Sequence, residues 1–547
     1  MNLKINGIDI TSADGKKYID LVREQGLEKG ALGVAVRGET ISLNAHARSG
    51  ADVRVLTLAD EEGRRIYERT LQFVLLAAAR RATPDLKLRI EHSFGDGLYV
   101  HAQSGAITPA QVQAIWAGME KLIDADAPIV RISGTKAEAL EYFRATGQDD
   151  KLRLMKYRNH EHFVMYALDG MQEYFYGEMA PSACCVRVSA LRAYYPGMVL
   201  MMPDTASPDR VAPFRDMPKL ARTFAQSARW NAILGVSNAA DLNEMAESRR
   251  LREFIRVNEA LHERSVQKIA DEFAASGARV VLIAGPSSSG KTTFSHRLLI
   301  ALRVLGYRPV KLSLDDYYID RSLVPIGEDG RRDLERIDIL DLELLNEHLL
   351  QLIQGETIQA PEFDFVTGTR KSETHPMRVE AGQPIIIEGI HGLNDQLTSA
   401  VPRDMKFKIY VSALTTINLD DHNRIRTTDA RLIRRMVRDY LFRGTSPEET
   451  MLGWDSVRRG EEKYIFPYQE QADAMFNTSL VYELPIMKKY VYPMLHAVPP
   501  ESPCYTRARR LVKFLNYFRT TDVEDEIPVN SILREFIGGC CFYREDD

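Results

Sequence analysis

The segment VVLIAGPSSSGKTT, residues 280–293, indicates the fold of this chain most directly. It begins with an apolar run typical of a buried strand, and apolar residues at helical spacing follow in 294–302. Between strand and helix, residues 285–292 match the pattern G-x-x-x-x-G-K-[ST] in full. This order predicts a loop whose backbone N–H groups surround the phosphates of a nucleotide at the positive end of a helix.

The residue types in this loop predict ATP and Mg²⁺ as its ligands. Lys291 is expected to contact the β and γ phosphates, and the Thr292 hydroxyl is expected to bind Mg²⁺. The alternative is a turn rich in glycine and serine before an ordinary helix. The predicted ATP-binding residues are Gly285, Pro286, Ser287, Ser288, Ser289, Gly290, Lys291, Thr292 and Thr293.

Length and composition limit the number of domains and the kinds of partner that we expect. A chain of 547 residues is too long for a single hydrophobic core, so about three or four domains are expected. The net charge of -5 gives no global argument for nucleic-acid binding. The five cysteines lack metal-ligand spacing, which favours reduced thiols, and no apolar run is long enough for a signal core or a membrane span. We therefore expect a cytoplasmic protein without membrane contact.

Residues 279–495 alternate between β-rich runs and helical segments. Four further strands are predicted at 309–314, 384–389, 407–411 and 474–477. The alternation predicts an α/β fold, in which a parallel sheet is covered by helices on both faces. Ligands bind beyond the carboxyl ends of such strands.

Two acids follow these predicted strand ends. Asp315 can lie beside the γ-phosphate and accept a proton from an attacking hydroxyl, while Glu388 can hold Mg²⁺ directly or through water. Phosphoryl transfer depends mainly on positioning and charge neutralisation. Lys291 and Asp315 are therefore predicted catalytic residues, and Thr292 and Glu388 are predicted metal-binding residues.

An arginine-rich helix is predicted within residues 424–443. Four arginines recur at helical spacing there, namely Arg431, Arg434, Arg435 and Arg438. A separate apolar stripe on the same helix leaves the arginines to clamp phosphates as a lid, with Arg435 and Arg438 in catalysis and Arg431 at the substrate. An ordinary basic helix face is the alternative.

Six segments of this half resemble the uridine kinase and phosphoribulokinase family of P-loop kinases. They are GPSSSGKTT (285–293), LDDYYID (314–320), RDLERIDILD (332–341), PEFDFVTGTRK (361–371), IIIEGIHGL (385–393) and DARLIRRMVRDYLFRG (429–444). The resemblance implies an ATP-dependent kinase with Asp315 as the catalytic base, Glu388 near the metal and the arginines as the lid. It also implies that Glu335 holds the ribose hydroxyls, with Asp333 as a second candidate.

The segment expected to contact the base departs from the pyrimidine kinases of that family. Those enzymes have Tyr-Asp-Phe followed by a His, whereas this chain has Phe363 at the first position and continues to Arg370 without a histidine. The missing hydroxyl and imidazole would have hydrogen-bonded a pyrimidine edge. We therefore expect phosphorylation of a ribose hydroxyl without assigning uridine, and count Phe363 and Arg370 among the substrate contacts.

The N-terminal half is similar to threonyl-tRNA synthetases. Residues 1–62, with a hairpin signal at Asn6-Gly7, resemble their β-grasp TGS domain. Residues 63–203 resemble their α+β editing domain in LLAAARRATPDLKL (75–88), FGDGLYV (94–100) and YFYGEMAPSACCVRV (174–188).

The editing-like segment departs from that family at its hydrolytic site. The family has an H-x-x-x-H pair where this chain aligns Arg69 and Phe73, and the Cys and His of C-x-G-x-H where it aligns Phe175 and Met179. Phenylalanine and methionine cannot replace imidazole or thiolate ligands. We therefore expect this domain to lack the hydrolytic site and to serve packing, binding or regulation.

Two segments complete the predicted domain order. Residues 204–278 are expected to form a linker and a helical connection, and residues 496–547 a helical tail. The apolar residues of the tail favour core packing or a contact within a homo-oligomer.

The function predicted from the sequence is ATP-dependent transfer of the γ-phosphate to a nucleoside hydroxyl, most plainly the 5′-hydroxyl. One alternative is a phosphoribulokinase-like kinase acting on a sugar phosphate. The other is a regulator whose N-terminal half contacts tRNA or a related RNA and whose P-loop acts as a nucleotide switch. The negative net charge and the lack of a surface that is both aromatic and basic argue against RNA.

Overall fold

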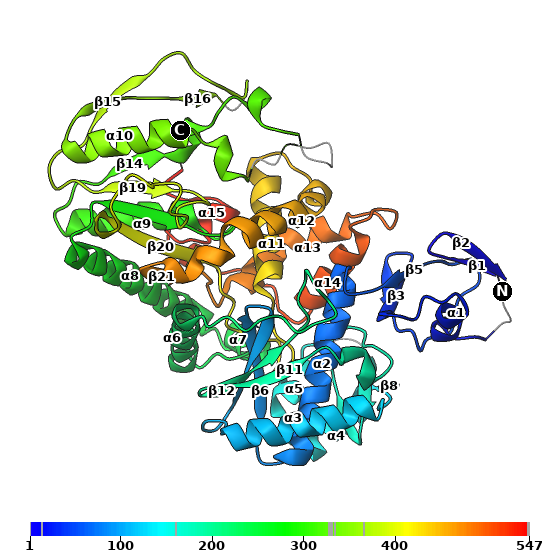
Figure 1. Cartoon of the computed structure of the whole chain (residues 1–547). Coiled ribbons are helices and arrows are strands. Elements are labelled where there is room, and N and C mark those ends of the chain that lie inside the picture. The colour runs from blue at the N-terminus through cyan, green and yellow to red at the C-terminus, as the bar shows by residue number, and fades with distance from the viewer. Residues whose placement is uncertain are drawn as a thin grey trace.

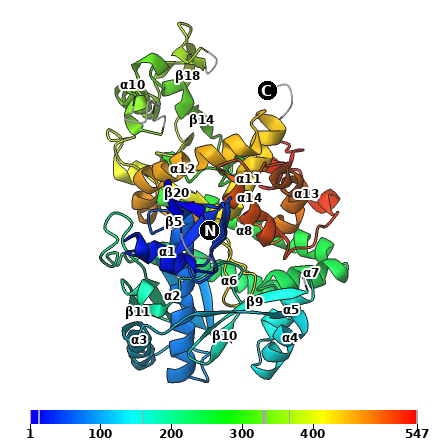
Figure 2. The same ribbon diagram turned by 90° about the vertical axis from the view of Figure 1, so that its right-hand side faces the viewer.

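The computed structural model describes residues 2–11, 15–158, 161–326, 332, 335–364 and 367–543. Figure 1 shows an N-terminal sheet at the right, two antiparallel sheets below, and a five-stranded parallel sheet at the upper left. Figure 2 shows the N-terminal sheet in front of the junction between the other two groups. Within the described ranges, no helix combines the length and apolarity needed to cross a membrane.

The N-terminal sheet has the strand order β2-β1-β5-β3-β4 and packs on one helix. Asn6 and Gly7 join the first hairpin with φ of 48° and 84°, as a two-residue turn with positive φ requires. Ile5 and Val34 of the sheet are buried in one cluster with Leu21 of the helix, which gives the expected β-grasp arrangement. The elements are β1 (Asn2–Ile5), β2 (Ile8–Thr11), α1 (Tyr18–Glu24), β3 (Gly33–Val36), β4 (Glu39–Ile41) and β5 (Asp52–Leu56).

The helix α2 (Glu61–Ala82) is the central element of the second group. Its side chains are buried almost all round, with Leu71, Val74 and Leu75 fully inaccessible, because sheets and helices surround it. The strand orders are β11-β12-β7-β6 and β10-β9-β8. The remaining elements are β6 (Leu88–Phe94), β7 (Gly97–Ala102), α3 (Pro109–Asp124), β8 (Val130–Thr135), α4 (Lys136–Ala145), α5 (Asp149–Met155), β9 (His162–Leu168), β10 (Met171–Glu173), β11 (Ala190–Tyr194) and β12 (Gly197–Met201).

Three helices connect this group to the parallel sheet, namely α6 (Pro218–Leu234), α7 (Ala239–Glu247) and α8 (Leu251–Ser276). Apolar side chains of α8, including Ile255 and Phe273, join the core cluster that contains Val281 and Ile283 of the sheet. The connection therefore covers one face of the sheet.

The parallel sheet has the strand order β14-β19-β13-β20-β21 and contains the five predicted strands. Their bounds are β13 (Val280–Ala284), β14 (Val310–Ser313), β19 (Ile385–Glu388), β20 (Lys406–Ser412) and β21 (Ala474–Asn477). Successive β13 residues point to opposite faces, so Val281 and Ile283 enter one core cluster while Val280 and Leu282 enter another. Both faces are thus covered, which confirms the predicted α/β sheet.

The other elements of this half lie around the sheet. Helices α9 (Lys291–Val304) and α11 (Thr427–Phe442) contribute Phe294 and Met436 to the same core cluster, and α10 (Leu342–Gln354) packs in the opposite one. Four short strands project beyond the sheet as two hairpins. They are β15 (Thr357–Ala360) with β18 (His375–Arg378), and β16 (Phe363–Asp364) with β17 (Thr369–Arg370).

The chain ends in helices that return to the centre of the molecule. After α12 (Pro447–Tyr464) and α13 (Glu483–His496), the tail forms α14 (Tyr505–Leu515) and α15 (Arg534–Ile537). Leu511 of α14 and Phe536 of α15 are fully buried in the core cluster that holds Phe294 of α9. The tail therefore belongs to the core beneath the glycine-rich loop.

Candidate active site

The glycine-rich loop between β13 and α9 is shaped by two close approaches. A Cβ at Gly285 would lie 1.8 Å from the Val411 carbonyl oxygen, so only glycine fits beside β20. Gly290 has φ of +81°, and a Cβ there would lie 2.6 Å from Ile532 of the tail. The chain then enters α9 at Lys291, and the N–H groups of its first turn favour an anion; the Thr293 N–H approaches the Glu535 carboxylate at 3.4 Å.

Lys291 folds back over its own loop. Its Nζ donates to the carbonyl oxygens of Gly285 at 2.9 Å and Pro286 at 3.2 Å. Burial lowers the pKa of Lys291, and the nearby Glu388 and Glu535 carboxylates oppose that shift. No carboxylate within the described residues forms an ion pair with Lys291, so its charge is available to a phosphate.

Thr292 and Glu388 meet between the loop and the end of β19. The Thr292 hydroxyl donates to Glu388 Oε1 at 2.6 Å, and the Ser295 hydroxyl donates to Oε2 at 3.2 Å. Lys311 Nζ lies 3.6 Å from the same carboxylate. A hydroxyl and a carboxylate side by side are oxygen ligands of the kind Mg²⁺ takes together with phosphate oxygens and water, so these residues fit a bound magnesium ion.

Asp315 lies two residues beyond β14, in a single 3₁₀ turn, Leu314–Tyr317. The parallel register pairs Ser313 with Glu388, which brings Asp315 to the same end of the sheet as the loop. The side chain lies on the surface of the site, yet the surrounding protein removes part of its hydration. This desolvation, then the Glu388 and Asp316 carboxylates, raise the pKa of Asp315. A raised pKa strengthens a carboxylate as a proton acceptor.

The arginines of α11 divide into two pairs. Arg435 Nη1 donates to the Ser287 hydroxyl at 2.9 Å, and Arg438 Nη2 approaches the Ser288 hydroxyl at 3.4 Å. These two arginines therefore reach the glycine-rich loop, as the prediction of a phosphate clamp requires.

The other pair is buried in ion pairs. Arg431 is 1% exposed and binds both carboxylate oxygens of Glu461, and Arg434 is fully buried against Glu483. The structure thus directs Arg431 to Glu461 and to the Ser287 carbonyl oxygen. The packed helix forms a wall beside the loop in this conformation.

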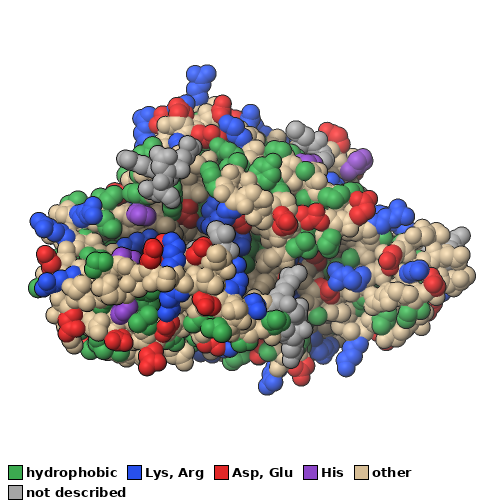
Figure 3. Space-filling model, turned by 90° about the horizontal axis from the view of Figure 1, so that it is seen from above, with side chains coloured by type: hydrophobic (Ala, Val, Ile, Leu, Met, Phe, Trp, Pro, Cys, Tyr) green, Lys and Arg blue, Asp and Glu red, His purple; other side chains and the backbone are tan. Residues whose placement is uncertain are grey.

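The remaining described substrate candidates lie beside α12 and beside the segment that carries Asp315. Glu335 packs against Gly460 of α12, where a Cβ would lie 3.2 Å from its side chain, and its charge acts on Lys291 and on the Tyr318 hydroxyl. Figure 3 shows that this upper face of the molecule is hollowed near its middle, with Lys and Arg side chains at the border. Asp333 lies outside the described residues.

Phe363 and Arg370 flank the segment that carries Asp315. The Phe363 ring meets the Tyr318 ring edge-on at 5.7 Å. Arg370 donates to the Asp341 carboxylate at 3.1 Å and to the Tyr318 carbonyl oxygen at 3.3 Å. Arg370 therefore holds the Asp315 segment in place, a positioning contact that the sequence did not indicate.

Two carboxylates at the loop were missed by sequence reasoning. Glu461 of α12 accepts the Ser287 backbone N–H at 3.1 Å. Glu535 of α15 accepts the Thr293 hydroxyl at 2.7 Å and an Arg438 N–H at 3.2 Å. Each comes from a remote segment whose local sequence predicts only a helix, so nothing near either residue signals a contact with the loop.

The four substituted positions of the editing-like segment lie in packed surroundings. The Phe73 and Phe175 rings meet edge-on at 5.7 Å, and Met179 is 1% exposed in the same cluster. The Arg69 guanidinium packs on Gly177 and donates to the Glu178 carbonyl oxygen. Side chains of the core thus occupy the volume between these positions.

A buried charge cluster joins α2 to the approach of α11. Glu68 accepts from Arg424 at 3.0 Å and from Arg426 at 2.6 Å, and all three side chains are largely buried. Burial alone would raise the pKa of Glu68, but the two arginines lower it to about 2. The N-terminal half is therefore attached to the element that carries Arg435 and Arg438.

Replacing Glu68 by glutamine is expected to destabilise the protein by about 3–5 kcal/mol, because two buried guanidinium groups lose their shared carboxylate. The lowered pKa adds an acid sensitivity: the stabilisation is complete above the ordinary value of 4.5 and is lost as pH falls towards about 2. Thermal unfolding measured near neutrality and at decreasing pH reports both effects. Glu141→Gln, at an exposed position of α4 without an ion pair in the described chain, is the matched control. Equal melting temperatures for the two variants would contradict the prediction.

Residues 280–482 match the model of the phosphoribulokinase / uridine kinase family. A uridine kinase from Ligilactobacillus salivarius is 33% identical over 195 residues, which are 36% of this chain and 82% of that protein. A uridine kinase from Bacillus pumilus is 32% identical over 195 residues, covering 36% and 83%.

Two further similarities have narrower scope. A threonine–tRNA ligase from Desulforamulus reducens is 35% identical over 132 residues, which are 24% of this chain but only 21% of that ligase. A solved structure of a possible uridine kinase from Bacillus stearothermophilus aligns with 39% of this chain and 98% of that chain, at 17% identity and a TM-score of 0.27. The family model and the coverage of whole kinase relatives show that the chain belongs to the phosphoribulokinase / uridine kinase family.

Proposed function

We propose that the protein transfers the γ-phosphate of ATP to a hydroxyl of a nucleoside. The observation that carries this proposal is the convergence of Lys291, Thr292, Glu388 and Asp315 at the carboxyl ends of three adjacent parallel strands. The similar bacterial proteins are uridine kinases, which favours a nucleoside over other acceptors. Residues 279–495 and the tail would carry this reaction.

Each residue of the site has a definite task in this proposal. The Asp315 carboxylate accepts the proton of the acceptor hydroxyl as its oxygen attacks the γ-phosphorus. Lys291, Arg435 and Arg438 stabilise the negative charge on the phosphate oxygens. Thr292 and Glu388 would hold Mg²⁺, which supplies further charge neutralisation when bound.

In the proposed reaction, residues beside α12 and beside the Asp315 segment select the acceptor. We propose that Glu335, whose charge acts on the Tyr318 hydroxyl, accepts hydrogen bonds from ribose hydroxyls, and that Phe363, whose ring meets that of Tyr318, contacts the base. Phe363 has no hydrogen-bonding group in its side chain, so we propose that the base is bound mainly by ring contact, with weak discrimination between bases. Residues 63–203, whose positions 73, 175 and 179 are packed with core side chains, would have a role other than hydrolysis.

A substrate screen with the full-length protein, ATP and Mg²⁺ tests the proposal. ADP formation is followed with a panel of nucleosides, deoxynucleosides, free sugars and sugar phosphates. We expect ribonucleosides to be phosphorylated. Deoxynucleosides, which lack a sugar hydroxyl, should be poorer substrates. Turnover only with sugar phosphates would replace the proposal by a phosphoribulokinase-like activity. No turnover on any acceptor, in folded protein that binds ATP, would overturn it.

A further inference from the structure

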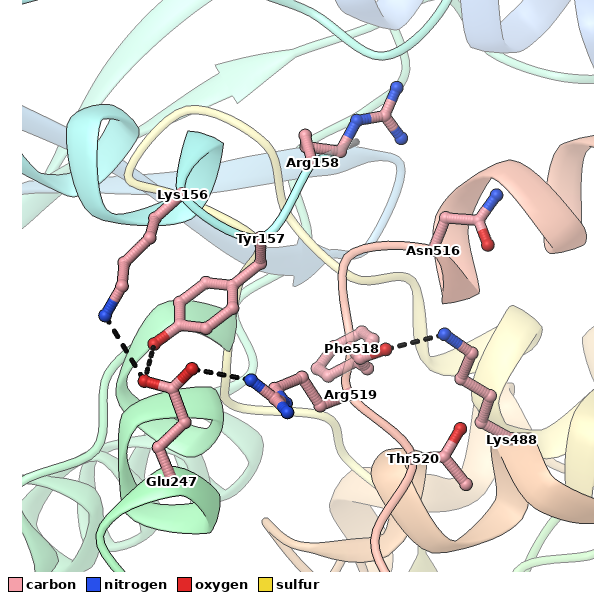
Figure 4. Close-up of a pocket in the computed structure, with 9 residues that line it drawn as sticks. All are labelled: Lys156, Tyr157, Arg158, Glu247, Lys488, Asn516, Phe518, Arg519 and Thr520. Atoms are coloured by element: carbon pink, nitrogen blue, oxygen red, sulfur yellow. Dashed lines mark hydrogen bonds and ion pairs between the residues drawn. The ribbon is translucent and has the colours of Figure 1, made fainter. Parts of the chain in front are cut away.

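A second cleft lies away from the glycine-rich loop, at the junction of both halves of the chain. Its volume is about 580 Å³, within the range of small-molecule sites. It is lined by residues 156–158 after α5, by Glu247 at the end of α7, by Lys488 of α13 and by residues 516 and 518–520 after α14. These residues come from four separate segments, and Figure 4 shows Lys156, Tyr157 and Arg519 directed towards Glu247.

The cleft carries an excess of positive charge. Four of its lining residues are cationic, Lys156, Arg158, Lys488 and Arg519, and Glu247 is its one carboxylate. The Glu247 carboxylate is shared, because it binds Arg519 at 2.6 Å, Lys156 at 3.2 Å and the Tyr157 hydroxyl at 3.1 Å. One carboxylate thus offsets two cations and leaves the other two without an acidic partner in the cleft.

Lys488 is a cation of the cleft without an acidic partner, and its ammonium lies over the Tyr492 ring at 5.2 Å. Its Nζ donates to the Phe518 carbonyl oxygen at 2.6 Å, and within the described part of the chain it forms no ion pair. Burial alone lowers the pKa of Lys488. An ammonium desolvated without a counter-charge is stabilised by an incoming anion.

Arg158 adds charge behind the cleft. It is 7% exposed, and its Nε and Nη1 have no hydrogen-bond partner in the residues that the structure describes. Its guanidinium lies over the Tyr517 ring at 4.6 Å and points away from Glu247 (Figure 4). Arg158 therefore strengthens the positive potential without occupying the cleft.

The uncharged groups suit a phosphate ester. Asn516 Oδ1 accepts the Tyr492 hydroxyl at 2.9 Å, so the Asn516 amide nitrogen is the atom that can donate to a ligand. Thr520 offers a hydroxyl beside Lys488, and Tyr157 offers a ring face (Figure 4). The donors of Asn516 and Thr520, together with the charged Lys488, match the three acceptor oxygens of a phosphate group better than the two of a carboxylate.

We propose that this cleft binds a phosphorylated small molecule, with its phosphate at Lys488 and its organic part against Tyr157. The site is separate from the glycine-rich loop, since none of its lining residues contributes to that loop. Binding of this ligand in the cleft does not depend on which acceptor the kinase phosphorylates.

Calorimetric titration of the full-length protein tests the proposal. Mg²⁺ and ADP are first added to saturation, so that the glycine-rich loop is occupied. Pyrophosphate, inorganic phosphate and AMP are then titrated as probes. We expect one additional site, with AMP binding more tightly than inorganic phosphate because its organic part contacts the cleft wall, and an affinity that falls with added salt.

Two matched variants decide the location of the site. Lys488→Gln is expected to weaken AMP and pyrophosphate binding about tenfold or more, the loss of one charge-assisted contact. Lys489→Gln changes the next residue of α13, whose Nζ pairs with Asp522 at 2.9 Å and Glu524 at 3.1 Å outside the cleft, and should bind like the unchanged protein. Unaltered ADP affinity shows that each variant is folded. Absence of a second site for all three probes, or equal binding by both variants, would overturn the proposal.

Discussion

Asp315→Asn is expected to lower kcat by about 10²- to 10⁴-fold, the usual contribution of a general base. The amide keeps the size of the side chain but cannot take the proton of the acceptor hydroxyl. KM for ATP should change little, because no hydrogen bond joins Asp315 to the described residues of the glycine-rich loop. Because the pKa of Asp315 is raised, its carboxylate becomes protonated at a higher pH than an ordinary aspartate. The kcat of the unchanged protein should therefore fall as pH decreases through that pKa.

Asp316→Asn is the matched control for this variant. Asp316 is the next residue, and its Oδ1 accepts the Phe363 backbone N–H at 3.3 Å, a bond that an asparagine side-chain oxygen can also accept. Steady-state kinetics on the acceptor found in the screen should show a large loss for Asp315→Asn and a small one for Asp316→Asn. A reversed order would assign the base to Asp316.

Lys291→Ala is expected to reduce kcat/KM for ATP by about 10²- to 10³-fold, as removal of one transition-state donor commonly does. Among the residues that the structure describes, its ammonium is hydrogen-bonded only to carbonyl oxygens of its own loop at 2.9 and 3.2 Å, so substitution should leave the core intact. Single-turnover rates at saturating ATP separate the loss in the chemical step from the loss in binding.

The control for this second variant is Lys268→Ala on α8, where an exposed lysine pairs with Glu272 at 3.5 Å. Its activity and its melting temperature should equal those of the unchanged protein. If Lys291→Ala retained full turnover, the glycine-rich loop would not be the catalytic centre, and the proposed phosphoryl transfer would fail with it.

The central sheet could be predicted from the sequence because its information is local. Each strand is a short apolar run, and the glycine-rich loop requires glycine at positions where a Cβ would meet Val411 or Ile532. The acids at strand ends follow from the same logic, since parallel strands place their carboxyl ends together. Asp315 and Glu388 were therefore predicted to lie close together without knowledge of any tertiary contact.

The partners of the individual α11 arginines could not be predicted in the same way. Helical spacing places Arg431, Arg434, Arg435 and Arg438 on one face of the helix, but it does not reveal which group each of them meets. The partners are Glu461 and Glu483 for the first pair and loop serines for the second. Glu461 lies 30 residues beyond Arg431, and Glu535 lies 242 residues beyond Thr293. Contacts over such separations depend on the whole packing arrangement.

The contact between Glu535 and Thr293 has a consequence for the order in which the protein is made. During translation, Thr293 leaves the ribosome 242 residues before the carboxylate that binds its hydroxyl. Glu68, in contrast, is synthesised 356 residues before Arg424, so it has already emerged when that arginine leaves the ribosome. Domains fold from the N-terminus as they are synthesised. The Glu68 partner of the kinase half is therefore synthesised before that half, whereas the surroundings of the nucleotide loop are completed only after Glu535 has emerged.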